Sequence, residues 1–182
     1  MYKFLPITLA LFLSFNVSAN ADKDRAEIKE TREKILKRLY KEQPEVKAKI
    51  AKAAGYATFS NIGVNLVFLS AGYGSGVVKN NDTGKDIYMK MLSGGVGIGL
   101  GVKDFNAVFV FNNNDALNDF VENGWDFSGQ ADAAAKSGKK GGEASEAATA
   151  VSGVDIYQMT ENGLALQATL QGTKYWKDED LN

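Results

Sequence analysis

The sequence predicts an α+β fold in which two N-terminal amphipathic helices pack on a largely antiparallel, glycine-rich sheet that is strongly curved or barrel-like. Three observations support this fold class. Helix-forming residues dominate up to residue 54, glycine, valine and aromatic residues dominate from Gly55 onwards, and short β-favouring runs then alternate with turn signals. We expect one globular unit, made of a helical segment at 22–54 and a β-rich domain at 55–182.

The first 21 residues have the pattern of a secretory signal peptide. Lys3 supplies a basic start, the apolar run FLPITLALFLSFNV follows, and small residues then precede a cleavage site after Ala19 or Ala21. The apolar run is short for a membrane span, and polar sequence follows it at once. We therefore expect export to the periplasm or the medium, and a mature chain with 20 basic and 22 acidic residues.

The segment after the signal predicts two short amphipathic helices. Apolar residues recur at helical spacing along the first of them, at Ile28, Ile35, Leu36 and Leu39. Pro44 ends this helix and suits the first turn of the second, which carries Val46 and Ile50 on its apolar side. Gly55 is expected to cap the second helix at its C-terminus.

Downstream of Gly55, seven runs favour β-strands, at 56–59, 64–69, 74–78, 86–92, 106–111, 154–160 and 164–176. The last two runs meet across a turn at 161–163. A short helix is expected within 112–124, capped by Asn or Asp and ended by Gly124. Residues 125–132 are a further strand candidate, and the small-residue segment 133–150 is expected to be a loop or weakly ordered. The aromatic residues expected in the core or sheet include Trp125, Trp176, Tyr73, Tyr88 and Tyr157.

Glycine occupies alternate positions in two stretches, with Gly72, Gly74 and Gly76 in the first, and Gly95, Gly97, Gly99 and Gly101 in the second. A period of two places the glycines of one strand on the same face, where a backbone, an aromatic ring or a ligand can approach closely. Neither stretch has the context of a dinucleotide fingerprint or the Gly-Lys-Ser/Thr of a phosphate-binding loop. We interpret both as a tightly packed or curved structural wall, with a ligand groove as the alternative.

Composition excludes several classes of chemistry. The chain has no cysteine and no histidine, so disulfides, histidine-based triads and histidine or cysteine metal sites are ruled out. The slight acidity argues against nucleic-acid binding. The SGKK run at 137–140 lacks the companion motifs of penicillin-recognising enzymes, and Asp115 and Asp119 lack the glycine and glutamate of a calcium loop. We therefore predict no catalytic residue, no metal and no cofactor.

The order of several segments resembles the SYLF lipid-binding domain family. These segments are AAGYATFSNIG at 53–63, GYGSGVV at 72–78, GVGIGLGVKDFNAVFVF at 95–111, GWDFSGQADAAAK at 124–136 and GLALQATLQGTKYW at 163–176. Members include exported bacterial proteins and eukaryotic proteins, yeast ones among them, that link phosphoinositide membranes to actin. The resemblance covers nearly all of residues 48–176 and implies a non-enzymatic, lipid-binding domain.

Residues 34–52, here called the basic segment, carry a net charge of about +5 within a slightly acidic protein. Two acidic residues oppose seven basic ones, which are Lys34, Lys37, Arg38, Lys41, Lys47, Lys49 and Lys52. In eukaryotic members a basic amphipathic N-terminal segment takes part in membrane binding, so the resemblance implies contact with anionic phospholipid here. The alternative is that the apolar stripe packs on the sheet and the lysines only confer solubility.

The sequence thus predicts a non-enzymatic lipid- or phospholipid-binding protein of the cell envelope, peripherally associated with an anionic membrane. One alternative is an envelope protein that binds another protein or a glycan through an exposed sheet edge. A hydrolase that combines serine with aspartate or lysine is a weaker alternative, because no paired acid–base motif is present.

Overall fold

The structure is a computed structural model that describes residues 9–65, 69–96, 105–127, 151–160, 163–166 and 172–182. The described helices are α1 (Leu9–Glu42), α2 (Glu45–Lys52) and α3 (Asn114–Asn123). The described strands are β1 (Gly55–Asn65), β2 (Leu69–Asn80), β3 (Asp86–Val96), β4 (Phe105–Phe111), β5 (Trp125–Asp126), β6 (Val154–Thr160), β7 (Gly163–Leu166) and β8 (Thr173–Lys177).

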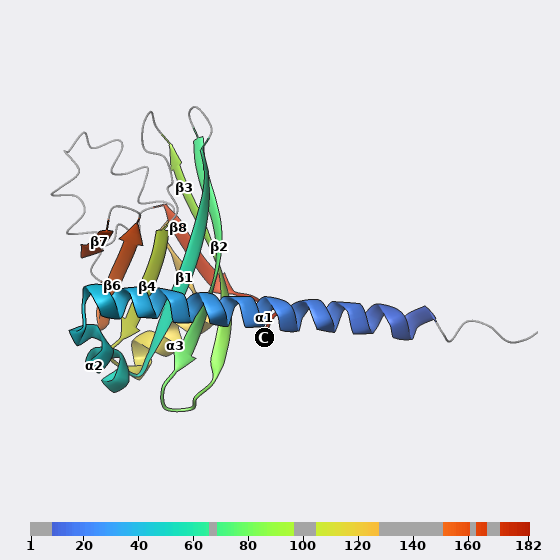
Figure 1. The fold of residues 1–182 in the computed structure, drawn as a ribbon, viewed down its shortest axis with the longest axis horizontal. Helices are drawn as coiled ribbons and strands as arrows, with labels where there is room; N and C mark the ends of the chain where they lie inside the picture. Colours follow the sequence, from blue (N-terminus) through green and yellow to red (C-terminus); the bar gives the residue numbers. More distant parts are fainter. Residues whose placement is uncertain (1–8, 66–68, 97–104, 128–150, 161–162, 167–171) are drawn as a thin grey trace, which may run out of the picture.

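These strands form one curved, antiparallel sheet in the order β5-β8-β3-β2-β1-β4-β6-β7 (Figure 1). Helices α1 and α2 pack on one face of the sheet, and α3 packs on the other. The predicted α+β class, with N-terminal helices on a strongly curved antiparallel sheet, is confirmed.

Helix α1 crosses the strands rather than running along them (Figure 1). Near its middle, Ile28 packs beside Val77 of β2 and Tyr88 of β3. Towards its end, the buried residues Ile35, Leu36 and Leu39 pack against β4 and β6. The apolar stripe predicted from the helical spacing is therefore used to hold α1 on the sheet. The helix begins at Leu9, within the predicted signal peptide, and ends just before Pro44.

The predicted C-terminal cap of α2 was wrong. Helix α2 ends at Lys52, its C-cap residue Ala53 has an extended conformation, and Gly55 is the first residue of β1. A Cβ atom at Gly55 would lie 2.5 Å from the carbonyl oxygen of Lys79, so glycine is required there by close packing of two strands. The last carbonyls of α2 are capped instead by the Asn81 side chain, whose Nδ2 donates to the oxygens of Ile50 (2.8 Å) and Ala53 (2.9 Å).

Several strand boundaries differ from those predicted. Strand β1 runs through residues 60–63, which the sequence pattern left between two separate strands. The single strand predicted at 164–176 contains parts of two strands that lie far apart in the sheet, since β7 pairs with β6 whereas β8 pairs with β3 and β5. Gly172, directly before β8, has a φ of 77°, which marks a break that the run of β-favouring residues concealed.

Helix α3 has the predicted caps. The Asn113 side chain accepts a hydrogen bond of 2.9 Å from the backbone N–H of Ala116, and Gly124 ends the helix with a φ of 66°. The helix places Phe120 in an aromatic cluster whose ring centroids lie about 4.5 to 6 Å apart, made of Phe59, Phe109, Phe111, Phe120, Trp125 and Tyr175. This cluster is the main core. Tyr88 and Tyr157 are also buried, whereas Tyr73 lies on the sheet but is exposed.

A half-buried ion cluster anchors α1 to the sheet beside its apolar stripe. Asp86, the first residue of β3, lies 3.0 Å from Arg32 Nη1, 3.2 Å from Lys29 Nζ and 3.5 Å from Lys79 Nζ. Burial acts to raise the pKa of Asp86, but the hydrogen bond from Lys29 and the charges of Arg32 and Lys79 outweigh it and lower this pKa below its ordinary value. The ionised form is therefore favoured in the folded protein.

We expect Asp86→Asn to lower the free energy of unfolding by about 1–2 kcal/mol at neutral pH, because Arg32 would keep only a neutral acceptor. The contribution of a carboxyl group with a lowered pKa is complete above its unfolded pKa, about 4, and is lost as the pH falls through the folded-state pKa. Urea unfolding at pH 7 and at pH 3 checks both parts. The difference between parent and variant should shrink at pH 3, and equal stability at pH 7 would contradict this role.

Candidate functional site

The first glycine stretch faces the interior of the sheet, on the side of α3. A Cβ atom at Gly76 would collide with the Phe59 ring and the Thr58 carbonyl oxygen, and one at Gly74 would collide with the Ser60 carbonyl oxygen and Met91. At Gly72 it would lie 2.5 Å from Ser93 Oγ and 2.6 Å from Asn61 Nδ2, whose side chains hydrogen-bond to each other in a buried position. These three glycines therefore leave room for neighbouring side chains to lie across β2.

The second glycine stretch falls mostly where the structure gives no description. Gly95 lies in β3, and the backbone of that strand pairs with β2 as far as Val96. Gly97, Gly99 and Gly101 lie outside the described residues. Whether this stretch is a wall or a ligand groove stays a prediction.

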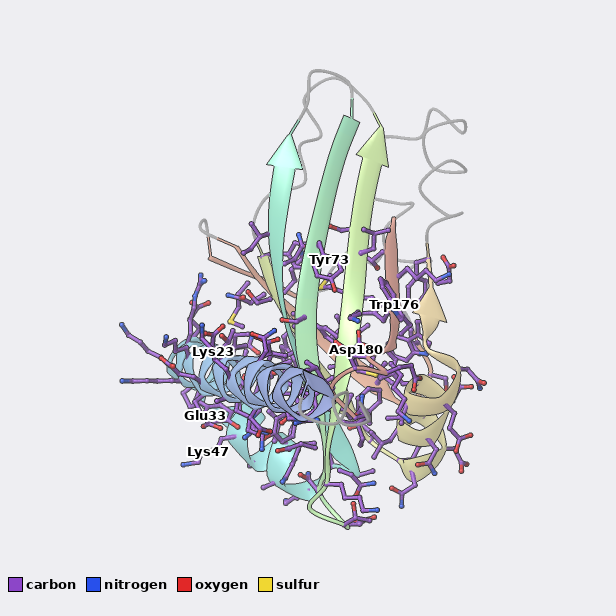
Figure 2. The ribbon with its side chains drawn as sticks, turned by 90° about the vertical axis from the view of Figure 1, so that its right-hand side faces the viewer. Lys23, Glu33, Lys47, Tyr73, Trp176 and Asp180 are labelled. Atoms are coloured by element: carbon purple, nitrogen blue, oxygen red, sulfur yellow. The ribbon has the colours of Figure 1, made fainter. Side chains whose placement is uncertain are left out.

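The basic segment covers the last turns of α1 and the whole of α2. Its apolar residues Val46 and Ile50 are buried with those of α1, so the charged side chains lie on the outer side of the helices. Lys34, Lys37, Lys41, Lys47, Lys49 and Lys52 are exposed and Arg38 is half-buried. Figure 2 shows Lys47 on the outer side of the helices, away from Trp176 and Asp180.

Some of these cations form ion pairs. Lys34 Nζ lies 2.6 Å from Glu30, Arg38 Nε lies 3.0 Å from Glu42, and Lys49 Nζ lies 3.1 Å from Asp155 of β6. The hydrogen bond that Lys49 donates to Asp155 raises the pKa of this lysine, against the opposing effect of its partial burial. Within the described part of the chain, Lys37, Lys41, Lys47 and Lys52 have no ion-pair partner. They are free to meet an external anion.

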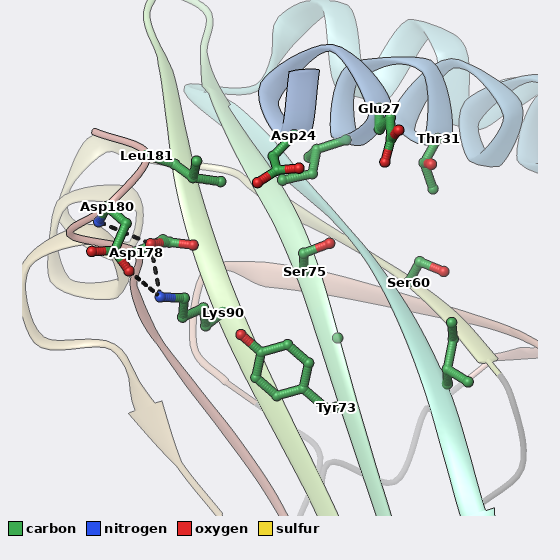
Figure 3. Close-up of a pocket in the computed structure, with 13 residues that line it drawn as sticks. Asp24, Glu27, Thr31, Ser60, Tyr73, Ser75, Lys90, Asp178, Asp180 and Leu181 are labelled. Carbon is green, nitrogen blue, oxygen red and sulfur yellow. Dashed lines mark hydrogen bonds and ion pairs between the residues drawn. The ribbon is translucent and has the colours of Figure 1, made fainter. Parts of the chain in front are cut away.

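A groove lies beneath α1 on the same face of the sheet (Figure 3). Its volume is about 480 Å³. Helix α1 contributes Asp24, Glu27, Ile28 and Thr31; the strands contribute Ser60, Ile62, Tyr73, Gly74, Ser75 and Lys90; and the C-terminal residues contribute Asp178, Asp180 and Leu181. We call this the sub-helix groove.

The sub-helix groove is acidic. Lys90 is the one lysine among its described lining residues, and it is held by Asp178 at 2.9 Å and Asp180 at 3.0 Å. The hydrogen bonds that Lys90 donates to these carboxylates raise its pKa. Asp24 and Glu27 add two further carboxylates from α1. The net charge of the lining is therefore negative, which does not suit an anionic phospholipid headgroup. Sequence reasoning missed this groove, and the acidic run at 178–180 was the signal available for it.

The fold and these surfaces define a binding domain built on a curved sheet, with exposed cations on its outer helices. Residues 92–182 match the family model described as Ysc84, Las17-binding protein actin regulator, and the chain belongs to this family, whose shared unit is the SYLF domain. The resemblance noted in the sequence is thus confirmed. The family is one of binding domains associated with lipid and actin and is not known for catalysis.

A curated relative extends the similarity beyond the residues that the family model covers. The chain is 39% identical over 146 residues to Beta cell expansion factor A of Aeromonas veronii. The aligned part makes up 80% of this chain and 54% of that protein, so the chain spans about half the length of this relative. Among the described residues, none of the helices has a stretch that is long and apolar enough to cross a membrane.

Proposed function

We propose that this protein binds lipid by laying the basic segment on an anionic membrane surface, as an exported, peripheral protein of the cell envelope. The observation that carries the proposal is the orientation of the two helices. The large aliphatic residues of the basic segment are buried against the sheet, and four of its lysines, which have no ion-pair partner among the described residues, point outwards.

The burial of the apolar stripe determines what kind of membrane contact the segment makes. Because Leu39, Val46 and Ile50 pack on the sheet, they are not available to enter the acyl region. Binding then rests on charge, with each lysine near an anionic surface contributing up to roughly 1 kcal/mol. Four such lysines give at most roughly 4 kcal/mol, which corresponds to weak and reversible recruitment.

Vesicle sedimentation tests this proposal. The mature chain, starting at Asp22, should co-sediment with vesicles that contain phosphatidylglycerol and stay in solution with vesicles of phosphatidylcholine alone. Binding should disappear as salt is raised, because the screening length falls from about 8 Å at physiological ionic strength to about 3 Å at 1 M. Equal binding to both vesicles, or binding that persists in high salt, would contradict a contact made by the basic segment.

The sheet-edge alternative has less support in the described part of the fold. Its two edge strands are β5, with two residues, and β7, with four. Short edge strands offer few unpaired backbone groups to a partner.

A further inference from the structure

Three large apolar side chains are exposed in the described part of the chain, and all three lie next to one another. They are Ile62, Tyr73 and Leu92, with exposed fractions of 68%, 54% and 46%. Ile62 of β1 is directly opposite Tyr73 of β2, which is directly opposite Leu92 of β3. Directly opposite residues in antiparallel strands point to the same face, so these side chains form one apolar row across three central strands.

The apolar row borders the sub-helix groove. Two residues further along the same strands, Ser60, Ser75 and Lys90 form the next row on the same face, about 7 Å away. One row further on, Val77 and Tyr88 are buried beneath α1. The small side chains of Ser60 and Ser75 leave the space between the helix and the sheet open (Figure 3). Neither hydroxyl has a hydrogen-bond partner among the described residues.

Carboxylates line the sub-helix groove beside the apolar row. Asp24 and Glu27 face the groove from α1, and Asp180 faces it from the C-terminal residues (Figure 3). Asp24 is half-buried and has no ion-pair partner in the part of the chain that the structure describes. Glu27 forms a long ion pair of 3.7 Å with Lys23, and both side chains are exposed. The apolar row therefore lies next to the sub-helix groove, which offers hydroxyl and carboxylate groups as hydrogen-bond acceptors.

We propose that the apolar row and the sub-helix groove together bind a segment of another protein that carries apolar side chains next to a lysine or arginine. The apolar side chains would cover Ile62, Tyr73 and Leu92. The cationic side chain would enter the groove between Ser60, Ser75 and the carboxylates of α1. An exposed apolar row beside complementary charge is a common feature of protein-binding surfaces.

Two other occupants, an anionic membrane and a second copy of this chain, fit this surface less well than a foreign segment with apolar and basic side chains. An anionic membrane would be repelled by the carboxylates of the sub-helix groove, whereas the basic segment would attract it. Lys174, which lies opposite Leu92 at the end of the apolar row, is paired with Asp126 at 3.0 Å. A second copy of this chain offers the basic segment as a cationic surface, but the apolar side chains of that segment are buried against its own sheet. A foreign segment can supply apolar and basic groups together.

Selection from a library of short random peptides displayed on phage tests the proposal, with the mature protein as bait. Ile62→Thr/Leu92→Thr is the matching bait without the apolar row, and threonine retains the β-propensity of these exposed strand positions. Peptides enriched on the parent should combine basic and apolar residues. In fluorescence anisotropy, the best of them should bind the row variant at least about tenfold more weakly.

A charge-matched pair of variants tests the groove. Asp24→Asn/Glu27→Gln should weaken the same peptide by about tenfold, whereas Asp119→Asn/Glu122→Gln, which removes two exposed carboxylates from α3, should not. Circular dichroism confirms that each variant is folded. The proposal is overturned if no peptide is enriched, if the enriched peptides are acidic, or if they bind the row variant as well as the parent. It is also overturned if the row variant loses vesicle binding, since the row would then contact lipid.

Discussion

Gly76→Val is expected to lower the free energy of unfolding by about 3 kcal/mol, near the upper end of the range for overpacked cores. Valine would place a branched side chain where the Phe59 ring and the Thr58 carbonyl oxygen already lie. Phe59 is fully buried and belongs to the aromatic cluster, so it has no free volume into which to move. The neighbouring backbone oxygen belongs to a paired strand and is equally fixed.

Ser75→Val is the matched control for this variant. Ser75 is adjacent to Gly76 in β2, but its side chain points to the other face, into the open groove. Valine is a good strand residue, so the control should be neutral or slightly stabilising. Thermal unfolding of the two variants and the parent makes the comparison. If Gly76→Val keeps the parent's midpoint, the alternate glycines of β2 are not required by packing.

Lys41→Glu/Lys47→Glu is expected to abolish co-sedimentation with vesicles that contain phosphatidylglycerol. Reversing two charges changes the net charge of the basic segment by four. At up to roughly 1 kcal/mol per charge, this removes up to roughly 4 kcal/mol, or about a thousandfold in partitioning. Both lysines are exposed and have no ion-pair partner in the described residues, so the fold should be unaffected.

The control for this experiment is Lys174→Glu/Lys177→Glu, which makes the same change in net charge on β8. Both of these lysines are exposed, and Lys174 is paired with Asp126 at 3.0 Å, so circular dichroism must first show that the control is folded. Strand β8 lies near the opposite edge of the sheet from β4 and β6, where the basic segment packs. The control should retain most of the binding. Equal losses in the two double variants would mean that only the net charge of the protein matters.

Local patterns in the sequence predicted the helices well. The helical spacing of Ile35, Leu36 and Leu39, the stop at Pro44, and the caps Asn113 and Gly124 are patterns that span only a few consecutive residues. Such patterns have the same form in every fold. The fold class followed from them and from the abrupt change in composition at Gly55.

The errors concern pairings between distant residues. Ser60, Asn61 and Gly63 are poor strand formers, yet they lie in β1, where Asn61 is buried and hydrogen-bonded to Ser93 of β3. Gly55 was mistaken for a helix cap because its close contact with Lys79 depends on the register of β1 and β2. The division between β7 and β8 likewise depends on which neighbouring strand is available, and this information is not local.

The candidate sites show the same distinction. The charge of the basic segment is evident from consecutive residues, and the structure adds which lysines are free. The sub-helix groove combines residues near both ends of the chain with the middle of the sheet, for example Asp24 with Ser75 and Asp180. Tyr73 and Leu92 are typical core residues by type. They are exposed because α1 crosses the strands over Val77 and Tyr88, two rows further along, and does not cover this part of the sheet. Figure 2 shows Tyr73 beyond the helix.

The most direct test of the proposed membrane contact uses labels at single cysteines, which the absence of natural cysteine makes possible. Ala48→Cys places a label on the exposed side of α2 without changing its charge, and Asn118→Cys places one on the exposed side of α3, across the sheet. On phosphatidylglycerol vesicles, a spin label at position 48 should become shielded from a water-soluble relaxation agent. The label at position 118 should stay as accessible as in solution. Shielding at position 118 with none at position 48 would contradict the account.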